Sequence, residues 1–285
     1  MRFEEFARLH GLIMSSVIPN KWVAVPTEDK PRSRNGRYKY LGDVAFVQNW
    51  ATMEKPVVWH PEGTSYDAFA IRTAIQKDAQ ERNRKEQEAI EKANKIIAES
   101  VSELHPYLTA KGFPKQHGMV WYENKVAKLV LPMRYNKTLR GIQLINPDGT
   151  KKFLFGQRTK GAYFCMDGGG LPIFCEGYAT ALSIKACMQA NKVPCSIYVC
   201  FSASNLKEVA STIKGGMVVA DNDANKVGES SAKDTGKPYW LSDKDGEDFN
   251  DYHQRVGIFT ASQSLKKLVF SCLRKPTTQS QQDHC

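Results

Sequence analysis

Short apolar runs between residues 171 and 253 end in acidic residues, and this pattern constrains the fold more than any other feature. One run ends at Glu176, and another, about forty residues later, ends at Asp221 and Asp223. Apolar runs bounded by Gly or Pro are typical of buried parallel strands. Ligands bind such sheets outside the carboxyl ends of the strands. We therefore expect these acids at the binding edge of an α/β fold, a parallel sheet covered by helices.

The acidic residues suit a hard divalent cation, Mg²⁺ or Mn²⁺. Asp221 and Asp223 stand two positions apart on a loop that leaves a strand, and Mg²⁺ usually takes only one or two protein carboxylates. Asp-Asn-Asp is also an ordinary turn, but its order after Glu176, with helix-forming residues 179–190 between them, favours a metal site. Two later acids could complete a second site or simply cap a helix; they are Asp248 and Asp251.

The motifs resemble the Toprim domain of primases and topoisomerases, and more specifically that of phage- and plasmid-type primases. The strings that carry the resemblance are Glu176-Gly-Tyr-Ala-Thr-Ala-Leu, Phe201-Ser-Ala-Ser-Asn205-Leu, Ala220-Asp-Asn-Asp and Asp248-Phe-Asn-Asp251. The resemblance is specific over 165–253, looser over 106–164, and absent from the first hundred residues. One position departs from it: bacterial primases often carry Glu-Gly-Tyr-x-Asp, and here the fifth residue is Thr180.

The resemblance implies a DNA primase, an enzyme that makes primers on single-stranded DNA in phage or plasmid replication. It implies Mg²⁺-dependent, template-directed nucleotidyl transfer from NTPs. Glu176, Asp221 and Asp223 would be the catalytic residues and metal ligands, with Glu176 either a ligand or the general base, and Asp248 and Asp251 would be further ligands. The sequence has no P-loop motif, so a replicative helicase is expected as a partner on another chain.

Two alternatives remain open at this stage. The first is a Toprim nuclease that cleaves phosphodiesters with the same acids. The second is a non-catalytic accessory protein that binds single-stranded DNA during replication. A topoisomerase is disfavoured, because 285 residues are too few to form the gate that such enzymes need.

The distribution of charge also indicates a nucleic-acid partner. The net charge is +10, and residues 101–165 carry eleven Lys and Arg against three acids, a balance of +8. Residues 166–260 carry nine against twelve, a balance of −3. A basic platform beside an acidic pocket suits metal-assisted chemistry on a polyanion, although a merely soluble basic protein would show the same total. The predicted phosphate contacts on the platform are Arg134, Lys152, Arg158 and Lys160.

The chain is expected to have five parts. Residues 66–104 contain no Gly or Pro and carry i, i+4 acid–base pairs such as Asp78–Arg82, which predicts one long solvated helix. Gly228 is expected to let a loop pass close to phosphate. The predicted parts are a small basic α+β module (1–65), a charged spacer helix (66–105), a basic strand-rich platform for template and nucleotide (106–165), a Toprim catalytic domain (166–260), and a C-terminal helix with a polar tail (261–285).

The N-terminal module carries a second set of candidate nucleic-acid contacts. Asn35-Gly36 lies between extended segments, which predicts a tight hairpin turn. Aromatic residues nearby, such as Trp22 and Tyr38, could stack on bases or form a small core. The basic residues predicted to contact nucleic acid here are Lys30, Arg32, Arg34 and Arg37.

The seven cysteines show no C-x-x-C spacing, so no zinc site is predicted. Cys175 and Cys200 lie inside apolar runs and are expected to be buried. An odd cysteine count without a signal peptide favours a cytoplasmic protein, in the host cell if the chain is phage-encoded. No apolar run approaches the length of a membrane helix, so no membrane partner is expected.

Overall fold

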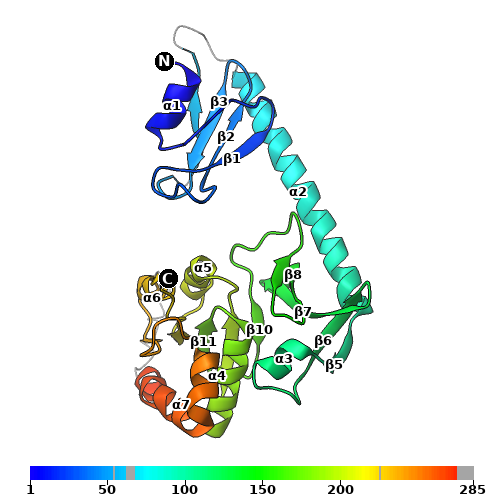
Figure 1. The fold of residues 1–285 in the computed structure, drawn as a ribbon, viewed down its shortest axis with the longest axis vertical. Helices are drawn as coiled ribbons and strands as arrows, with labels where there is room; N and C mark the ends of the chain where they lie inside the picture. The colour runs from blue at the N-terminus through cyan, green and yellow to red at the C-terminus, as the bar shows by residue number, and fades with distance from the viewer. Residues whose placement is uncertain (54, 62–67, 225, 275–285) are drawn as a thin grey trace, which may run out of the picture. The chain divides into compact units, whose positions relative to one another are not determined.

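A computed structural model describes residues 1–53, 55–61, 68–224 and 226–274 of the chain (Figure 1). The chain divides into two units, Met1–Glu81 and Arg82–Cys285. The start of the predicted spacer helix at 66–67 and the predicted polar tail after 274 lie outside the described residues. None of the helices in the described ranges combines the length and apolar character needed to cross a membrane.

Unit 1 is a small α+β unit with an aromatic core. Its antiparallel sheet has the order β1-β2-β3-β4 and packs against helix α1. The centroid of the Phe3 ring lies 5.6 Å from the ring centroid of Tyr38, 5.0 Å from that of Tyr40 and 5.6 Å from that of Trp59. The elements are α1 (Phe3–Leu9), β1 (Trp22–Val25), β2 (Gly36–Tyr40), β3 (Ala45–Asn49) and β4 (Val57–Trp59).

The predicted tight turn at Asn35-Gly36 is wrong. Gly36 is the first residue of β2 and pairs with both Val25 and Asn49, so the loop of the β1–β2 hairpin is residues 26–35. A Cβ at Gly36 would lie 2.8 Å from Thr27 Cγ2, which is too close for any larger residue. The Asn-Gly pair therefore reflects close packing inside a sheet rather than a turn.

Helix α2 (Ala68–Glu99) ends five residues earlier than predicted, because residues Val101–Leu104 form strand β5. Its first part belongs to unit 1, where Asp78 accepts hydrogen bonds from Trp22 Nε1 and Lys39 Nζ, both at 2.7 Å. Its last turns are not solvated as predicted. A narrow stripe of small and apolar residues within the charged sequence packs on the first sheet of unit 2; its buried members are Ala89, Ala93 and Ile96.

The first sheet of unit 2 is antiparallel, with the order β5-β6-β7-β8-β9, and confirms the strand-rich character predicted for 106–165. Its residues alternate between two faces. Leu131 and Ile145 face the core shared with the second sheet, whereas Ile142 and Leu144 pack with α2. The elements are β5 (Val101–Leu104), α3 (Pro106–Ala110), β6 (His117–Glu123), β7 (Val126–Tyr135), β8 (Thr138–Ile145) and β9 (Lys151–Phe153).

The second sheet of unit 2 is the predicted parallel sheet covered by helices. Its order is β10-β12-β11-β13-β14, and all neighbours are parallel except β10 and β12. Helices α4 and α7 run side by side on one face, and α5 and α6 pack on the other (Figure 1). The elements are β10 (Phe164–Met166), β11 (Leu171–Cys175), α4 (Tyr178–Ala190), β12 (Cys195–Val199), α5 (Ala203–Thr212), β13 (Met217–Val219), α6 (Val227–Asp234), β14 (Tyr239–Trp240) and α7 (Phe249–Arg274).

Two features of this sheet bear on the site at its edge. Strands β11 and β13 are neighbours at its centre, so the residues that follow them meet at one edge. Helix α7 is interrupted at Gly257, whose φ of 78° and ψ of 165° are not helical, and the C-terminal helix predicted within 261–285 corresponds to the part after this break. Cys175 and Cys200 are buried as predicted.

Candidate active site

A cavity of about 640 Å³ opens at the carboxyl ends of β11 and β13. Four of the five predicted metal ligands lie in its wall: Glu176, Asp221, Asp248 and Asp251. The wall also contains side chains from the first sheet, from α3 and from the end of β12, including Lys111, Gln143, Lys151 and Phe201. The structure thus brings the acids together with cationic, amide and aromatic groups that the sequence analysis did not select.

Glu176 directly follows β11 and precedes α4 by one residue. Burial, and secondly the charge of Asp223, raise the pKa of its carboxyl to about 7. The backbone N–H of Ala203, at the start of α5, donates to this carboxylate, and the Lys151 ammonium partly offsets the rise in pKa. The Glu176 carboxyl therefore changes its protonation state near neutral pH, as expected of a general base or a metal ligand.

Asp221 follows β13 and is the most perturbed acid of the site. Burial raises the pKa of its carboxyl to about 8, assisted by the charges of Glu176, Asp248 and Asp223. Its Oδ1 atom and Oε1 of Glu176 are both buried without a hydrogen-bond partner among the described residues. Unpaired buried carboxylate oxygens are costly, and a bound cation would satisfy both, so the residues present fit Mg²⁺.

The other predicted ligands differ in their surroundings. Asp223 is half-buried beside the cavity rather than in its wall, and acts on Glu176 through its charge. Asp248 precedes α7 and accepts a hydrogen bond from the Asp251 N–H at 2.8 Å, so it caps this helix while facing the cavity. Asp251 pairs with Lys111 Nζ at 3.3 Å.

Within the described residues, no three His, Cys, Asp or Glu side chains already surround one point. A cation bound here would therefore take one or two protein oxygens and complete its shell with water and phosphate, as Mg²⁺ usually does. Glu176 and Asp221 are the residues we expect to supply those oxygens.

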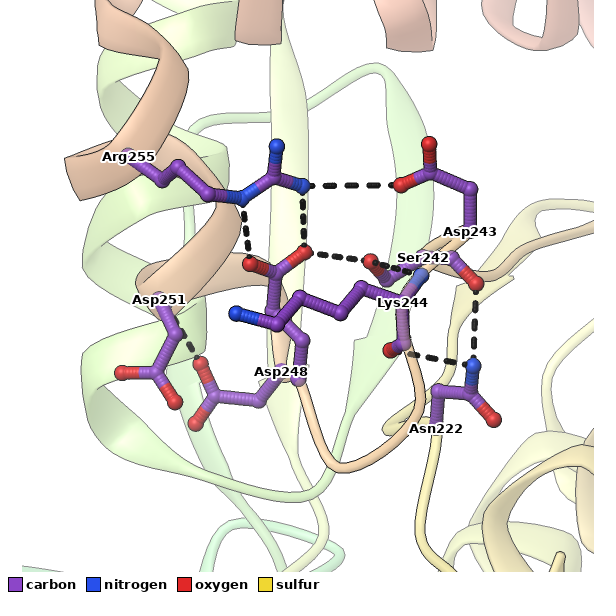
Figure 2. A network of polar contacts seen from close by, with 8 residues as sticks. Asn222, Ser242, Asp243, Lys244, Asp248, Asp251 and Arg255 are labelled. Atoms are coloured by element: carbon purple, nitrogen blue, oxygen red, sulfur yellow. Dashed lines mark hydrogen bonds and ion pairs between the residues drawn. The ribbon is translucent and has the colours of Figure 1, made fainter.

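The loop that carries Asp221 and Asp223 is held in place by a polar network that the sequence analysis missed (Figure 2). Asn222 donates from Nδ2 to the carbonyl oxygens of Ser242, at 3.0 Å, and Lys244, at 3.2 Å. Arg255 Nε donates to buried Glu247 at 2.7 Å and lowers the pKa of that carboxyl to about 2. Asn222 thus ties the acidic loop to the 242–247 loop, and Arg255 ties that loop to α7.

Gly228 supports the same loop in a way that differs from the expectation. A Cβ on Gly228 would lie 2.2 Å from the carbonyl oxygen of Asp221, so the space beside it is filled by protein backbone rather than open to phosphate. The glycine allows the first turn of α6 to pack directly under Asp221.

Replacing Gly228 with alanine is therefore expected to destabilise the protein by about 1–3 kcal/mol, as overpacking does. Helix propensity alone predicts the opposite sign, a gain of about 1 kcal/mol, because Gly228 lies within α6. Denaturant unfolding of Gly228→Ala would separate the two, with Ser230→Ala on the same helix as the control. A more stable Gly228→Ala variant would show that the acidic loop can move aside without lowering the free energy of unfolding.

The raised pKa values predict how stability depends on pH. The carboxyls of Glu176 and Asp221 have pKa values of about 7 and about 8 in the folded chain, against ordinary values of 4.5 and 3.8. At pH values between the unfolded and the folded pKa of each carboxyl, the folded state holds a proton that the unfolded state has released. Their stabilising contribution is therefore complete below about pH 4 and is lost as pH rises through about 8.

Comparison with the double variant Glu176→Gln/Asp221→Asn isolates this contribution from other groups. Without divalent cations, the double variant should melt at a higher temperature than the unmodified protein at pH 8.5, and the difference should shrink towards pH 5. Added Mg²⁺ should raise the melting temperature of the unmodified protein at pH 8.5 and leave the double variant unchanged. Equal melting temperatures at every pH would contradict the burial of these charges.

The predicted phosphate contacts of the basic platform lie outside the wall of the acidic cavity. Lys152 is on the opposite face of β9 from Lys151, since neighbouring residues of a strand point to opposite faces. Lys160 pairs with Glu208 at 3.5 Å, Arg134 donates to the Lys137 carbonyl, and Arg158 is exposed. Their role in binding nucleic acid stays a prediction. The cationic residues in the cavity wall are instead Lys111 and Lys151.

The four basic residues of unit 1 that were predicted to contact nucleic acid are exposed or half-buried. Lys30, Arg32 and Arg34 are exposed on the 26–35 loop. Arg37 donates to Gln48 Oε1 and stacks over the Trp22 ring at 4.3 Å. Tyr38 cannot stack on a base as suggested, because its ring is fully buried and its hydroxyl donates to the Ser16 carbonyl. Contact of the four basic residues with nucleic acid also stays a prediction.

Residues 172–258 match the protein family described as Toprim domain. No curated protein sequence matches the chain. Among solved structures, the primase fragment of the bacteriophage T7 primase-helicase protein is similar over 57% of this chain and 69% of that one, with 16% identity and a TM-score of 0.40. A structure of bacteriophage T7 lagging-strand DNA polymerase interacting with primase domains of two gp4 subunits bound to an RNA/DNA hybrid and dTTP contains a second similar chain. That likeness covers 60% of this chain and 92% of the other, with 14% identity and a TM-score of 0.42.

Both TM-scores are low, so the family assignment rests on the match over 172–258. This span begins within β11, which leads to Glu176, includes both loop aspartates, and ends within α7, after Asp248 and Asp251. It coincides with the parallel sheet and with the acidic edge of the cavity. The resemblance inferred from the motifs is thereby confirmed: residues 172–258 of this chain form a Toprim domain.

Proposed function

We propose that this protein is a DNA primase that joins nucleotides on a single-stranded DNA template with the help of Mg²⁺. The observation that carries the proposal is the pair of buried, unpartnered carboxylate oxygens on Glu176 and Asp221 at the edge of the Toprim sheet. A lysine of the first sheet lies beside them: a Cβ built on Gly177 would be 3.9 Å from Lys151 Nζ. Acids that suit a cation and an ammonium that suits phosphate thus share one cavity.

Glu176 and Asp221 would hold the cation, and Asp223 would add its charge from the side. When bound, Mg²⁺ would neutralise the phosphates of an incoming nucleotide and favour attack by the 3′-hydroxyl. Lys151 would orient a phosphate by charge, and Lys111 would keep Asp251 in place through their ion pair. Glu176, with a carboxyl pKa of about 7, could also accept the proton of the 3′-hydroxyl.

The substrates proposed are single-stranded DNA and NTPs. The +8 balance of residues 101–165 supports a polyanionic template, and the exposed basic residues of unit 1 offer a second contact. A replicative helicase is proposed as a further partner, as the resemblance of the motifs to those of phage- and plasmid-type primases implies.

Incorporation of labelled NTPs on single-stranded DNA, with and without Mg²⁺, tests the proposal. A product that requires NTPs, template and Mg²⁺ together supports a primase. Cleavage of DNA in the absence of NTPs would replace it with a nuclease. Binding of DNA that ignores Mg²⁺, without any new product, would leave a non-catalytic accessory protein.

A further inference from the structure

We infer that Gln143, Phe201 and Phe153 form a nucleoside subsite at the acidic cavity, an inference that rests on the proposed function and names how its substrate is recognised. The ligand is a nucleoside triphosphate. Its phosphates lie towards Lys151 and the acids, its base stacks on Phe201, and its polar edge or sugar bonds to Gln143.

Gln143 is the residue that points to a ligand. Its side chain is in the cavity wall and the residue is only 4% exposed. No hydrogen bond joins its amide to a described residue, and the amide is not among the buried polar atoms that lack a partner, so it is open to the cavity and a ligand can reach it. The side chain offers two donor hydrogens and an acceptor oxygen, which is the combination that base edges and sugar hydroxyls match.

The register of the first sheet places this amide among groups that fit a nucleotide. Gln143 of β8 pairs directly with Phe153 of β9, and Lys151 stands two residues before Phe153. Paired residues on neighbouring strands, and residues two apart on one strand, share a face of the sheet. A cation, an amide and an aromatic ring therefore line one face, which is the face that contributes to the acidic cavity.

Phe201 supplies the stacking surface from the Toprim sheet. It follows β12, lies in the cavity wall, and its backbone N–H donates to the carbonyl oxygen of Glu176 at 2.9 Å. Its ring meets that of Phe153 at 6.1 Å, nearly edge to face at 82°, so Phe153 braces it from the other sheet. Its φ of 70° is unusual for a bulky side chain. An aromatic face beside a phosphate-binding pocket suits any nucleobase.

Two probes separate this subsite from the phosphate site: ATP and inorganic tripolyphosphate, each titrated in Mg²⁺ into the full chain without template. Gln143→Leu and Phe201→Ala should each weaken ATP binding about tenfold, which is typical of one lost stacking or hydrogen-bonding partner. Both variants should leave tripolyphosphate binding unchanged. The matched control is Phe155→Ala, since this ring lies two residues beyond Phe153, is 85% exposed and is outside the cavity wall.

Thermal unfolding distinguishes a binding role of Gln143 from a structural one. Leucine has a similar shape, and the amide makes no hydrogen bond with a described residue, so Gln143→Leu should melt at about the same temperature as the unmodified protein. A clear fall in melting temperature would mean that the amide holds the fold, and would overturn its assignment. Phe201→Ala then tests the stacking surface independently.

Unchanged ATP binding in both variants, or an equal loss for ATP and tripolyphosphate, would overturn the subsite. These outcomes are distinct from failure of the proposed function. ATP binding that depends on Gln143 and Phe201 without any primer synthesis would refute the primase and keep a nucleotide subsite. Primer synthesis by Gln143→Leu with an unchanged KM for NTPs would keep the primase and refute the subsite.

Discussion

Asp221→Asn is expected to abolish Mg²⁺-dependent nucleotidyl transfer and to leave affinity for single-stranded DNA nearly unchanged. The substitution keeps the shape of the side chain but removes the charge that would hold a cation at an otherwise unsatisfied oxygen. DNA affinity should survive, because it comes chiefly from Lys and Arg at phosphates. Asp223→Asn is expected to abolish transfer as well, since its charge also acts on Glu176.

NTP incorporation and DNA binding measured on the same preparations check this result. The control is Asp234→Asn, an aspartate of the same domain that is exposed on α6 and paired with Lys207 at 3.0 Å. Near-normal synthesis by Asp221→Asn would remove Asp221 from the catalytic site. Loss of DNA binding along with synthesis would mean that the acidic loop supports the fold rather than the chemistry.

Glu176→Gln is expected to lower the rate of nucleotide addition by about 10²–10⁴-fold, the usual cost of removing a general base or its equivalent. The side chain keeps its size and its position between β11 and α4 but can no longer accept a proton or hold a cation strongly. Single-turnover incorporation at saturating NTP isolates this step from substrate binding. Glu229→Gln, at a glutamate paired with Lys233 on α6, serves as the control. A loss below tenfold would demote Glu176 to a structural role.

The Toprim sheet and its acids could be predicted from the sequence because each depends on a local signal. Buried parallel strands appear as apolar runs, and the acids follow the runs that became β11 and β13. The same reasoning predicted one acidic site from Glu176, Asp221, Asp223, Asp248 and Asp251, and all of these except Asp223 lie in the wall of one cavity.

Features that depend on register or on distant packing could not be predicted. Lys151 and Lys152 are identical neighbours in the sequence, and only the pairing of β9 with β8 decides which one faces the cavity. Gly36 resembles a turn residue until Thr27 is seen against it. The buried stripe of α2 could not be recognised within a highly charged sequence, because only two or three apolar residues are needed to pack a helix where a sheet covers them.

The place of Gln143 in the cavity wall belongs to the same class of feature. A glutamine within a strand carries no local sign that it will line a cavity. Only the arrangement of two sheets and a helix around the cavity shows where its side chain lies. The residues proposed to recognise substrate were therefore less visible in the sequence than those proposed to catalyse.

The contacts of Asn222 have a consequence for how this site can change. Both of its donated hydrogen bonds go to main-chain carbonyl oxygens, those of Ser242 and Lys244, so they depend on the path of the loop and not on its side chains. The side chains of residues 243–245 are exposed. Their charges can be exchanged, acid for base, without removing either of these hydrogen bonds. The position of the acidic loop and the charge of the surface beside it are thus separately adjustable by mutation.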